Sequence, residues 1–143
     1  MSTPSLHTFR LTSRLGEIDA ARRWASDHAR HAAFEEEAVH SIELALTEAL
    51  SNVIRHSYAE QPNHRIELDL TLYEDRLRLD IRDLGCRFDR GSHEVMDLDT
   101  PRDGGYGVML IEMLMDEVVR ETSGRAGNRL SLVKYRTQGA AHG

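Results

Sequence analysis

Two stretches of the chain alternate strictly between aliphatic and polar residues, and they constrain the fold more than any other feature. Between residues 66 and 72, every second position is Ile or Leu, and the positions between them are Glu, Asp and Thr. Residues 77–81 repeat the alternation after the turn residues Glu74 and Asp75. Because successive side chains of a strand point to opposite faces of a sheet, each stretch predicts a strand with one buried face. The short turn between them predicts an antiparallel hairpin.

Three other stretches have apolar residues at helical spacing: residues 16–30, 35–56 and 108–115. Ser13 is placed to cap the first of these helices, because a hydroxyl at that position can accept a hydrogen bond from a free backbone N–H. Glu35 opens an acidic run at the start of the second, where negative charge is favoured.

Weaker strand patterns occupy residues 6–11, 118–122 and 130–135. Helices segregated against an antiparallel sheet predict an α+β fold, a two-layer sandwich. The length fits one domain, which we expect to span residues 1–137 and to be followed by a disordered tail at 138–143.

Charge and composition narrow the classes of function. The 143 residues carry a formal net charge of -6, with 18 Lys and Arg against 24 Asp and Glu. Phosphate neutralisation needs clustered cations that carboxylates do not offset, so we expect no nucleic-acid partner. The sequence has neither an apolar run of membrane-spanning length nor a signal-peptide pattern, so we expect a cytoplasmic protein with no membrane contact.

Cysteine and histidine give weaker indications. Cys86 is the only cysteine and cannot build a disulfide framework. It is either a nucleophile with a partner distant in the sequence or, more commonly for a cysteine without further context, an ordinary loop residue. His28 and His31 have helical spacing but lack a third ligand for a metal, so we expect them to be solvated.

The helix expected at 35–56 carries Glu48 and Asn52 four residues apart, which stacks the two side chains on one face. An amide oxygen suits Mg²⁺, which prefers oxygen donors, waters and substrate phosphates. A carboxylate one turn earlier is placed to polarise a hydroxyl near a phosphate. Taken alone, the pair is better explained as a polar stripe that faces solvent.

Two segments with glycine have both an ordinary and a chemical interpretation. Asp83 closes the alternating strand, and at the mouth of the strand its carboxylate can accept a hydrogen bond from an exocyclic amine such as that of adenine. Gly85 then lets a base lie close to the backbone. The alternative is a simple turn. The sequence GGYG at 104–107 precedes a helix and offers backbone amides to a phosphate, or it merely connects two elements.

The order of these segments along the chain resembles the order of motifs in the Bergerat-fold ATPases. This superfamily includes the ATP domains of gyrases, chaperones, histidine kinases and mismatch-repair proteins. Within it, the chain looks like the anti-sigma factor serine kinases of bacterial partner-switching systems. The resemblance covers nearly the whole chain and is carried by ELALTEALSNVIRHSY, DLGCRFD, GGYGVMLIEMLMDEV and GNRLSLVKY. It implies a mixed, mainly antiparallel sheet covered on one face by helices, and ATP and Mg²⁺ as cofactors.

The resemblance also implies a role for each matched residue. Glu48 matches the catalytic base, Asn52 the Mg²⁺ ligand, and Asp83 the carboxylate that binds adenine. The nucleotide-binding glycines of the family match Gly85, Gly105 and Gly107. Asn128 stands where many members of the superfamily have a threonine near adenine, and we carry it over as an ATP-binding residue. Arg87 stands where many have a second glycine, and it either contacts phosphate from the lid or is solvated.

Residues 84–104 have no periodicity and are crowded with charge, which predicts a lid that phosphate orders and that is otherwise mobile. Three functions compete. The first is an ATP-dependent serine-protein kinase that phosphorylates an anti-anti-sigma antagonist, sequesters a sigma factor and forms a homodimer. The second is a nucleotide-gated binding module without useful phosphotransfer, or one that acts on a target other than a sigma factor. The third, a general ATP hydrolase, is disfavoured by the short chain.

Overall fold

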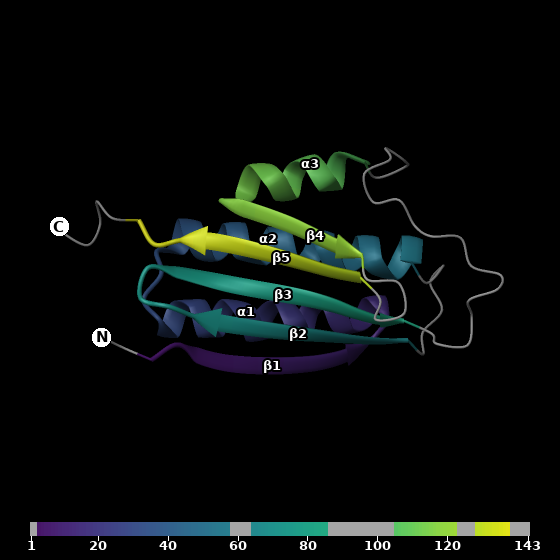
Figure 1. Ribbon diagram of the computed structural model, residues 1–143, viewed down its shortest axis with the longest axis horizontal. Helices are drawn as coiled ribbons and strands as arrows, with labels where there is room; N and C mark the ends of the chain where they lie inside the picture. The colour runs from purple at the N-terminus through teal and green to yellow at the C-terminus, as the bar shows by residue number, and fades with distance from the viewer. Residues whose placement is uncertain (1–2, 58–63, 86–104, 123–127, 138–143) are drawn as a thin grey trace.

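The computed structural model describes residues 3–57, 64–85, 105–122 and 128–137, which form a five-stranded sheet with helices packed against one face (Figure 1). The strands, in the order β1-β2-β3-β5-β4 across the sheet, are β1 (Ser5–Thr12), β2 (Arg65–Leu72), β3 (Arg76–Gly85), β5 (Asn128–Tyr135) and β4 (Glu117–Thr122). The helices are α1 (Ile18–His31), α2 (Glu36–Asn52) and α3 (Gly105–Leu114).

This arrangement confirms the predicted α+β two-layer sandwich. All four strand pairings between the described strands are antiparallel, whereas the resemblance allowed for a mixed sheet. The hairpin predicted from strict alternation is the β2–β3 pair, with Leu68 opposite Ile81 and Leu70 opposite Leu79.

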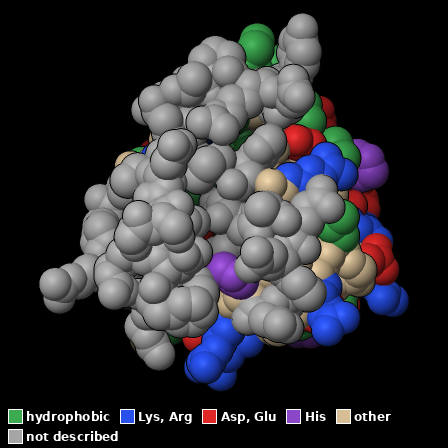
Figure 2. Space-filling model, turned by 90° about the vertical axis from the view of Figure 1, so that its right-hand side faces the viewer, with side chains coloured by type: hydrophobic (Ala, Val, Ile, Leu, Met, Phe, Trp, Pro, Cys, Tyr) green, Lys and Arg blue, Asp and Glu red, His purple; other side chains and the backbone are tan. Residues whose placement is uncertain are grey.

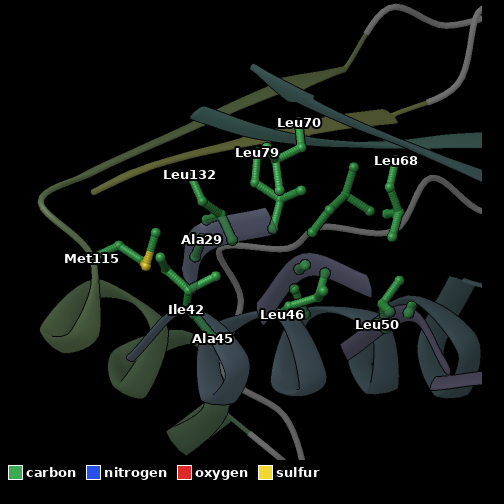
Figure 3. Packing of buried hydrophobic residues seen from close by; sticks show 14 of the residues in the cluster. Ala29, Ile42, Ala45, Leu46, Leu50, Leu68, Leu70, Leu79, Met115 and Leu132 are labelled. Carbon is green, nitrogen blue, oxygen red and sulfur yellow. The ribbon is translucent and has the colours of Figure 1, made fainter. Parts of the chain in front are cut away.

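The aliphatic positions of that hairpin form the middle of the core. Leu68, Leu70 and Leu79 are fully buried on the face of the sheet that the helices cover. Helix α2 presents Ile42 and Leu46 to them at helical spacing (Figure 3). Each such side chain contributes about 1.5–3 kcal/mol by leaving water, so the core fixes α2 firmly on the sheet.

Helix α1 packs through small side chains. Ala21, Ala25 and Ala29 have no exposed surface and lie one turn apart along the helix. Because alanine adds only a methyl group, the backbone of α1 approaches the sheet and α2 closely. The larger Trp24 lies at the margin of this contact, with its ring 5.3 Å from that of Phe9 on β1.

The outer face of the sheet carries ion pairs between neighbouring strands. Arg10 of β1 and Arg82 of β3 both pair with Glu67 of the intervening β2. The hydrogen bond from Arg10 is the main cause that holds the pKa of Glu67 below its usual range. This alternation of charge keeps the uncovered face of the sheet polar, as the sequence pattern predicted.

The beginning of α1 differs from the prediction. Ser13 does not cap a helix: its hydroxyl accepts a hydrogen bond from the backbone N–H of His64 at 3.1 Å. A short 3₁₀ turn, Leu15–Glu17, precedes α1 instead. Ser13 thus closes the β1–β2 edge, because its position directly after β1 favours a partner across the sheet over one along the helix.

His28 is also less solvated than we expected. Its ring stacks on that of His7 from β1, with 4.1 Å between the ring centroids, and it packs edge-on against Trp24. Burial is the main cause that lowers the pKa of His28. The helical pattern alone could not predict this contact, since His7 belongs to another element.

None of the helices in the described part of the chain combines the length and apolar character that crossing a bilayer requires. The tail predicted at 138–143 lies outside the described residues.

Candidate functional site

Several elements begin or end at one end of the sheet, which we call the pocket end and which lies at the right of Figure 1. Helix α2 and strand β3 finish there, and α3 and β5 start there. The antiparallel pairing of β3 with β5 brings Asp83 directly opposite Asn128. The sheet therefore joins two segments that the sequence separates by more than forty residues.

A pocket opens between these element ends. Its polar lining consists of an amide from α2, a carboxylate from β3 and residues of β4 and β5, while aliphatic side chains form the remainder of the wall. The lining residues are Ala49, Asn52, Val53, Ile81, Asp83, Val108, Ile111, Arg120, Asn128, Arg129 and Leu130. A mostly apolar wall with a few polar groups is typical of a site for a small organic ligand.

Asp83 continues the buried face of β3 as a carboxylate. It follows Leu79 and Ile81 at every second position, so its side chain points toward the helices, and it is only 6% exposed. A buried carboxylate at an apolar wall can accept hydrogen bonds from the edge of a planar ligand. Asn128, half-buried on the neighbouring strand, adds an amide with both donors and acceptors.

Asn52 is the last residue of α2 and lines the same pocket. The helix does not stop at this residue, since Val53–Ser57 continue it as a π-helical turn. The predicted helix to position 56 is therefore present, but its last turn is wider than an α-helix. Such π turns are frequent at functional sites, where they re-aim the side chains of a helix.

Glu48 lies one turn before Asn52, as the spacing predicted, but it does not line the pocket. Its half-buried carboxyl group lies against Gly107 in the first turn of α3. Gly85 ends β3 and Gly105 begins α3, so the backbone of both residues lies at the pocket end.

Figure 2 looks onto the pocket end, where both acidic and basic side chains of the described residues appear at the margin. Residues 86–104, with Cys86, Arg87 and most of the predicted lid, lie outside the described residues.

Arg120 is a pocket residue that the sequence did not indicate. It lies on β4 opposite Leu130, half-buried, and forms an ion pair with Glu112 of α3 at 3.5 Å. The run EVVRET has no clear alternation, so the sequence could not tell that Arg120 shares the inward face with Val118. The pairing of β4 with β5 settles its direction.

The described residues fit a magnesium ion that is held mainly through a nucleotide. No three side chains of His, Cys, Asp or Glu come together as a metal-binding group in the described part of the chain. Asn52 offers one amide oxygen at the pocket wall. Mg²⁺ commonly takes one or two protein oxygens and completes its shell with waters and substrate phosphates, which this donor set allows.

Known proteins are similar to this chain in sequence and in fold. Residues 11–134 match the family model described as the histidine kinase-like ATPase domain. The chain is 32% identical over 119 residues to the serine-protein kinase RsbW of Listeria monocytogenes, covering 78% of this chain and 76% of that one. It is 31% identical over 108 residues to RsbW of Bacillus subtilis, covering 68% and 64% of the two chains.

A solved structure of the RsbU and RsbW domains of Rv1364c from Mycobacterium tuberculosis matches the fold with a TM-score of 0.65 and 16% identity. The match covers 95% of this chain and 33% of that larger one. The fold, the extent of the family match and the identity to the curated relatives agree. The chain belongs to the histidine kinase-like ATPase domain family and, within it, to the RsbW family of serine-protein kinases.

Proposed function

We propose that this protein is an ATP-dependent serine-protein kinase that phosphorylates an anti-anti-sigma antagonist and sequesters a sigma factor. The observation that carries the proposal is the meeting of Asn52, Asp83 and Asn128 in one pocket, with Glu48 one helical turn away. The names of the curated relatives support the kinase activity, and they share about a third of their aligned residues with this chain.

In the proposed reaction, adenine enters the pocket with its exocyclic amine donating a hydrogen bond to Asp83. The backbone at the start of α3, near Gly105, would hold the phosphates. Asn52 supplies an oxygen to Mg²⁺, which when bound neutralises charge on the phosphates.

Glu48 then accepts the proton from a serine hydroxyl of the antagonist while that oxygen attacks the γ-phosphorus. The bond from the γ-phosphorus to the bridging oxygen breaks, and ADP leaves with the electron pair. Positioning and charge stabilisation supply most of the acceleration in phosphoryl transfer, and a base adds a factor of about 10² to 10⁴.

The test separates the base from the binding groups. Glu48→Gln keeps the shape of the side chain but removes its basicity, so we expect ATP affinity to persist and transfer of labelled phosphate to the antagonist to fall by about 10²-fold or more. Asn52→Ala should lose affinity for Mg-ATP and activity together. Asp83→Asn should weaken nucleotide binding in titration calorimetry without unfolding the chain.

Three results would contradict the proposal in different ways. A protein that gives no binding heat with ATP or ADP at any Mg²⁺ concentration has no nucleotide site. If Glu48→Gln transfers phosphate at the wild-type rate, Glu48 is not the base. A wild-type protein that binds ATP and a partner but transfers nothing is the nucleotide-gated binding module.

The proposal also covers the location of the protein in the cell and its oligomeric state. A sigma factor and its antagonist act in the cytoplasm, so this is the proposed location. The proposed state is a homodimer, which sedimentation analysis of the purified protein would test directly.

A further inference from the structure

Gly107 and Glu48 meet where the first turn of α3 crosses α2. Gly107 is buried, and a Cβ atom built on it would lie 2.8 Å from Cδ and 2.9 Å from Cγ of Glu48, with a carboxylate oxygen nearer still. Real Cβ atoms essentially never approach other heavy atoms more closely than 3.0 Å. The space that a side chain at 107 would need is therefore filled by the carboxyl group of Glu48.

The requirement for glycine at this position is one of space. Gly107 lies within α3 and belongs to a regular helical turn, so the backbone itself does not demand glycine. A helix ordinarily favours alanine over glycine, because glycine loses more conformational freedom when it is fixed. The missing methyl group at 107 is thus explained by its neighbour on α2.

The two helices run in opposite directions at this contact. Gly107 near the start of α3 touches Glu48 in the later half of α2, and beyond the end of α3 Met115 points toward Ile42 in the earlier half (Figure 3). Ile111 and Met115 are buried in the common core, which fixes α3 along α2. The contact at Gly107 is held in place by packing further along both helices.

We propose that Gly107 is a positioning residue for the catalytic base: by lacking a side chain, it leaves the place in which Glu48 is held. The proposal rests on the function proposed above, since it concerns the orientation of the base in that reaction. Gly107 itself need not touch the nucleotide. A methyl group at this position would push the Glu48 side chain into another rotamer while Asn52 and Asp83 keep theirs.

The direct test is Gly107→Ala, compared with Gly16→Ala as a matched control. A Cβ at Gly16 meets nothing within 4 Å, so that variant should behave as wild type. Gly107→Ala should lower kcat for phosphate transfer by about 10²-fold, the effect of misplacing a reacting group by about 1 Å, with KM and the Kd for ATP nearly unchanged. A rise in the Kd for ATP that accounts for the loss would instead assign Gly107 to phosphate binding and overturn the proposal.

A double-mutant cycle shows whether Gly107 acts through Glu48. In a Glu48→Gln background the base is already lost, so adding Gly107→Ala should lower transfer no further. Equal losses in both backgrounds overturn the proposal. If Glu48→Gln alone transfers at the wild-type rate, the proposed base is wrong, and this failure is visible before Gly107 is changed.

A stability cycle keeps the contact testable if Gly107→Ala folds poorly. Glu48→Ala removes the atoms that the new methyl group would meet, so any fall in Tm caused by Gly107→Ala should disappear in the Glu48→Ala background. The readout is thermal unfolding of the full chain without nucleotide. A fall in Tm of the same size in both backgrounds means that the two side chains do not compete for one space, and the proposal fails.

Discussion

At the residue scale, Glu17 joins the end of β1 to the beginning of α1. One of its carboxylate oxygens accepts a hydrogen bond from the backbone N–H of Thr12 at 3.0 Å, and the other accepts from the Thr12 hydroxyl at 2.5 Å. The hydrogen bond from the hydroxyl is the largest cause that lowers the pKa of Glu17 from its ordinary value of 4.5. The charged form is therefore the one that the fold favours.

We predict that Glu17→Gln lowers the free energy of unfolding by about 1 kcal/mol at pH 7, since hydrogen bonds to a charged group are stronger than those to a neutral amide. A carboxyl group with a lowered pKa stabilises the fold above its unfolded pKa, and this contribution is lost as the pH falls through the folded pKa. The difference between wild type and variant should thus shrink in acid. Urea unfolding at pH 7 and near pH 3 measures it.

The exposed Glu37 supplies the control for that prediction, since Glu37→Gln removes the same charge from another helix. Its effect should be small at both pH values. A difference between wild type and Glu17→Gln that stays constant from pH 7 to pH 3 would contradict the assignment to the charged carboxylate.

The sequence predicted single residues well where a residue's element dictates its direction. Asp83 continues an unbroken alternation, so its inward direction follows from the strand itself. Arg120 and His28 depend on which element lies opposite, and no local pattern contains that information. The roles of Glu48, Asn52 and Asp83 stay predictions, although Asn52 and Asp83 do meet at one pocket.

At the element scale, Arg136 fastens the end of β5 to two connections. Its guanidinium donates hydrogen bonds to the carbonyl of Glu74 in the β2–β3 turn at 3.0 Å and to the carbonyl of Ala32 after α1 at 2.8 Å. It also lies over the ring of the buried Phe34, 4.3 Å from the centroid. One side chain thus bridges three segments at the end of the sheet opposite the pocket.

We predict that Arg136→Ala lowers the free energy of unfolding by about 1–3 kcal/mol, because two backbone carbonyls lose their donor and Phe34 loses its cover. Arg136→Lys should recover only part of this, since a single ammonium cannot reproduce the planar fork of donors. Nucleotide affinity should not change in either variant. Chemical unfolding and ATP titration of the same samples measure both effects, and equal stability of all three proteins would rule out the bridge.

The sequence predicted which segments form helices and strands better than it predicted the residues at which these elements begin and end. The alternation of β2 and β3 predicted both strands, with Asp83 closing the second, but β3 continues to Gly85, two residues further. Ser13 shows why ends are difficult: a hydroxyl beside a helix suggests a cap, and only the position of His64 shows that it serves the sheet. Ends depend on partners, whereas periodicity depends on the segment alone.

At the scale of the whole molecule, the sequence predicted the layers but not the order of strands. Hairpins between consecutive strands are a natural expectation, and β2–β3 and β4–β5 meet it. The position of β5 between β3 and β4 did not follow from any sequence pattern. The residue patterns of β4 and β5 are also compatible with other neighbouring strands. The position of β5 creates the pocket, since it brings Asn128 beside Asp83.

The strand order also divides the described part of the molecule into two pieces of chain that lie side by side. Residues 3–85 supply three strands and two helices, and residues 105–137 supply α3, β4 and β5. The two pieces meet along the β3–β5 pairing and where α3 packs on α2, and the pocket takes Asn52 and Asp83 from one and Arg120 and Asn128 from the other. A nucleotide bound there would contact both pieces and hold them together across the β3–β5 pairing.

A chain cut by a protease at a site engineered between 86 and 104 should therefore remain assembled, with ADP prolonging the lifetime of the two-piece protein. At a concentration of one hundred times its Kd, a ligand that needs both pieces stabilises the assembly by about 2.7 kcal/mol, which corresponds to a roughly hundredfold weaker tendency to separate. Exchange of a fluorescently labelled piece into the cut protein, with and without ADP, measures this directly. If ADP does not change the exchange rate, the nucleotide contacts only one of the two pieces. If ADP slows the exchange, nucleotide occupancy sets how long the two pieces stay together.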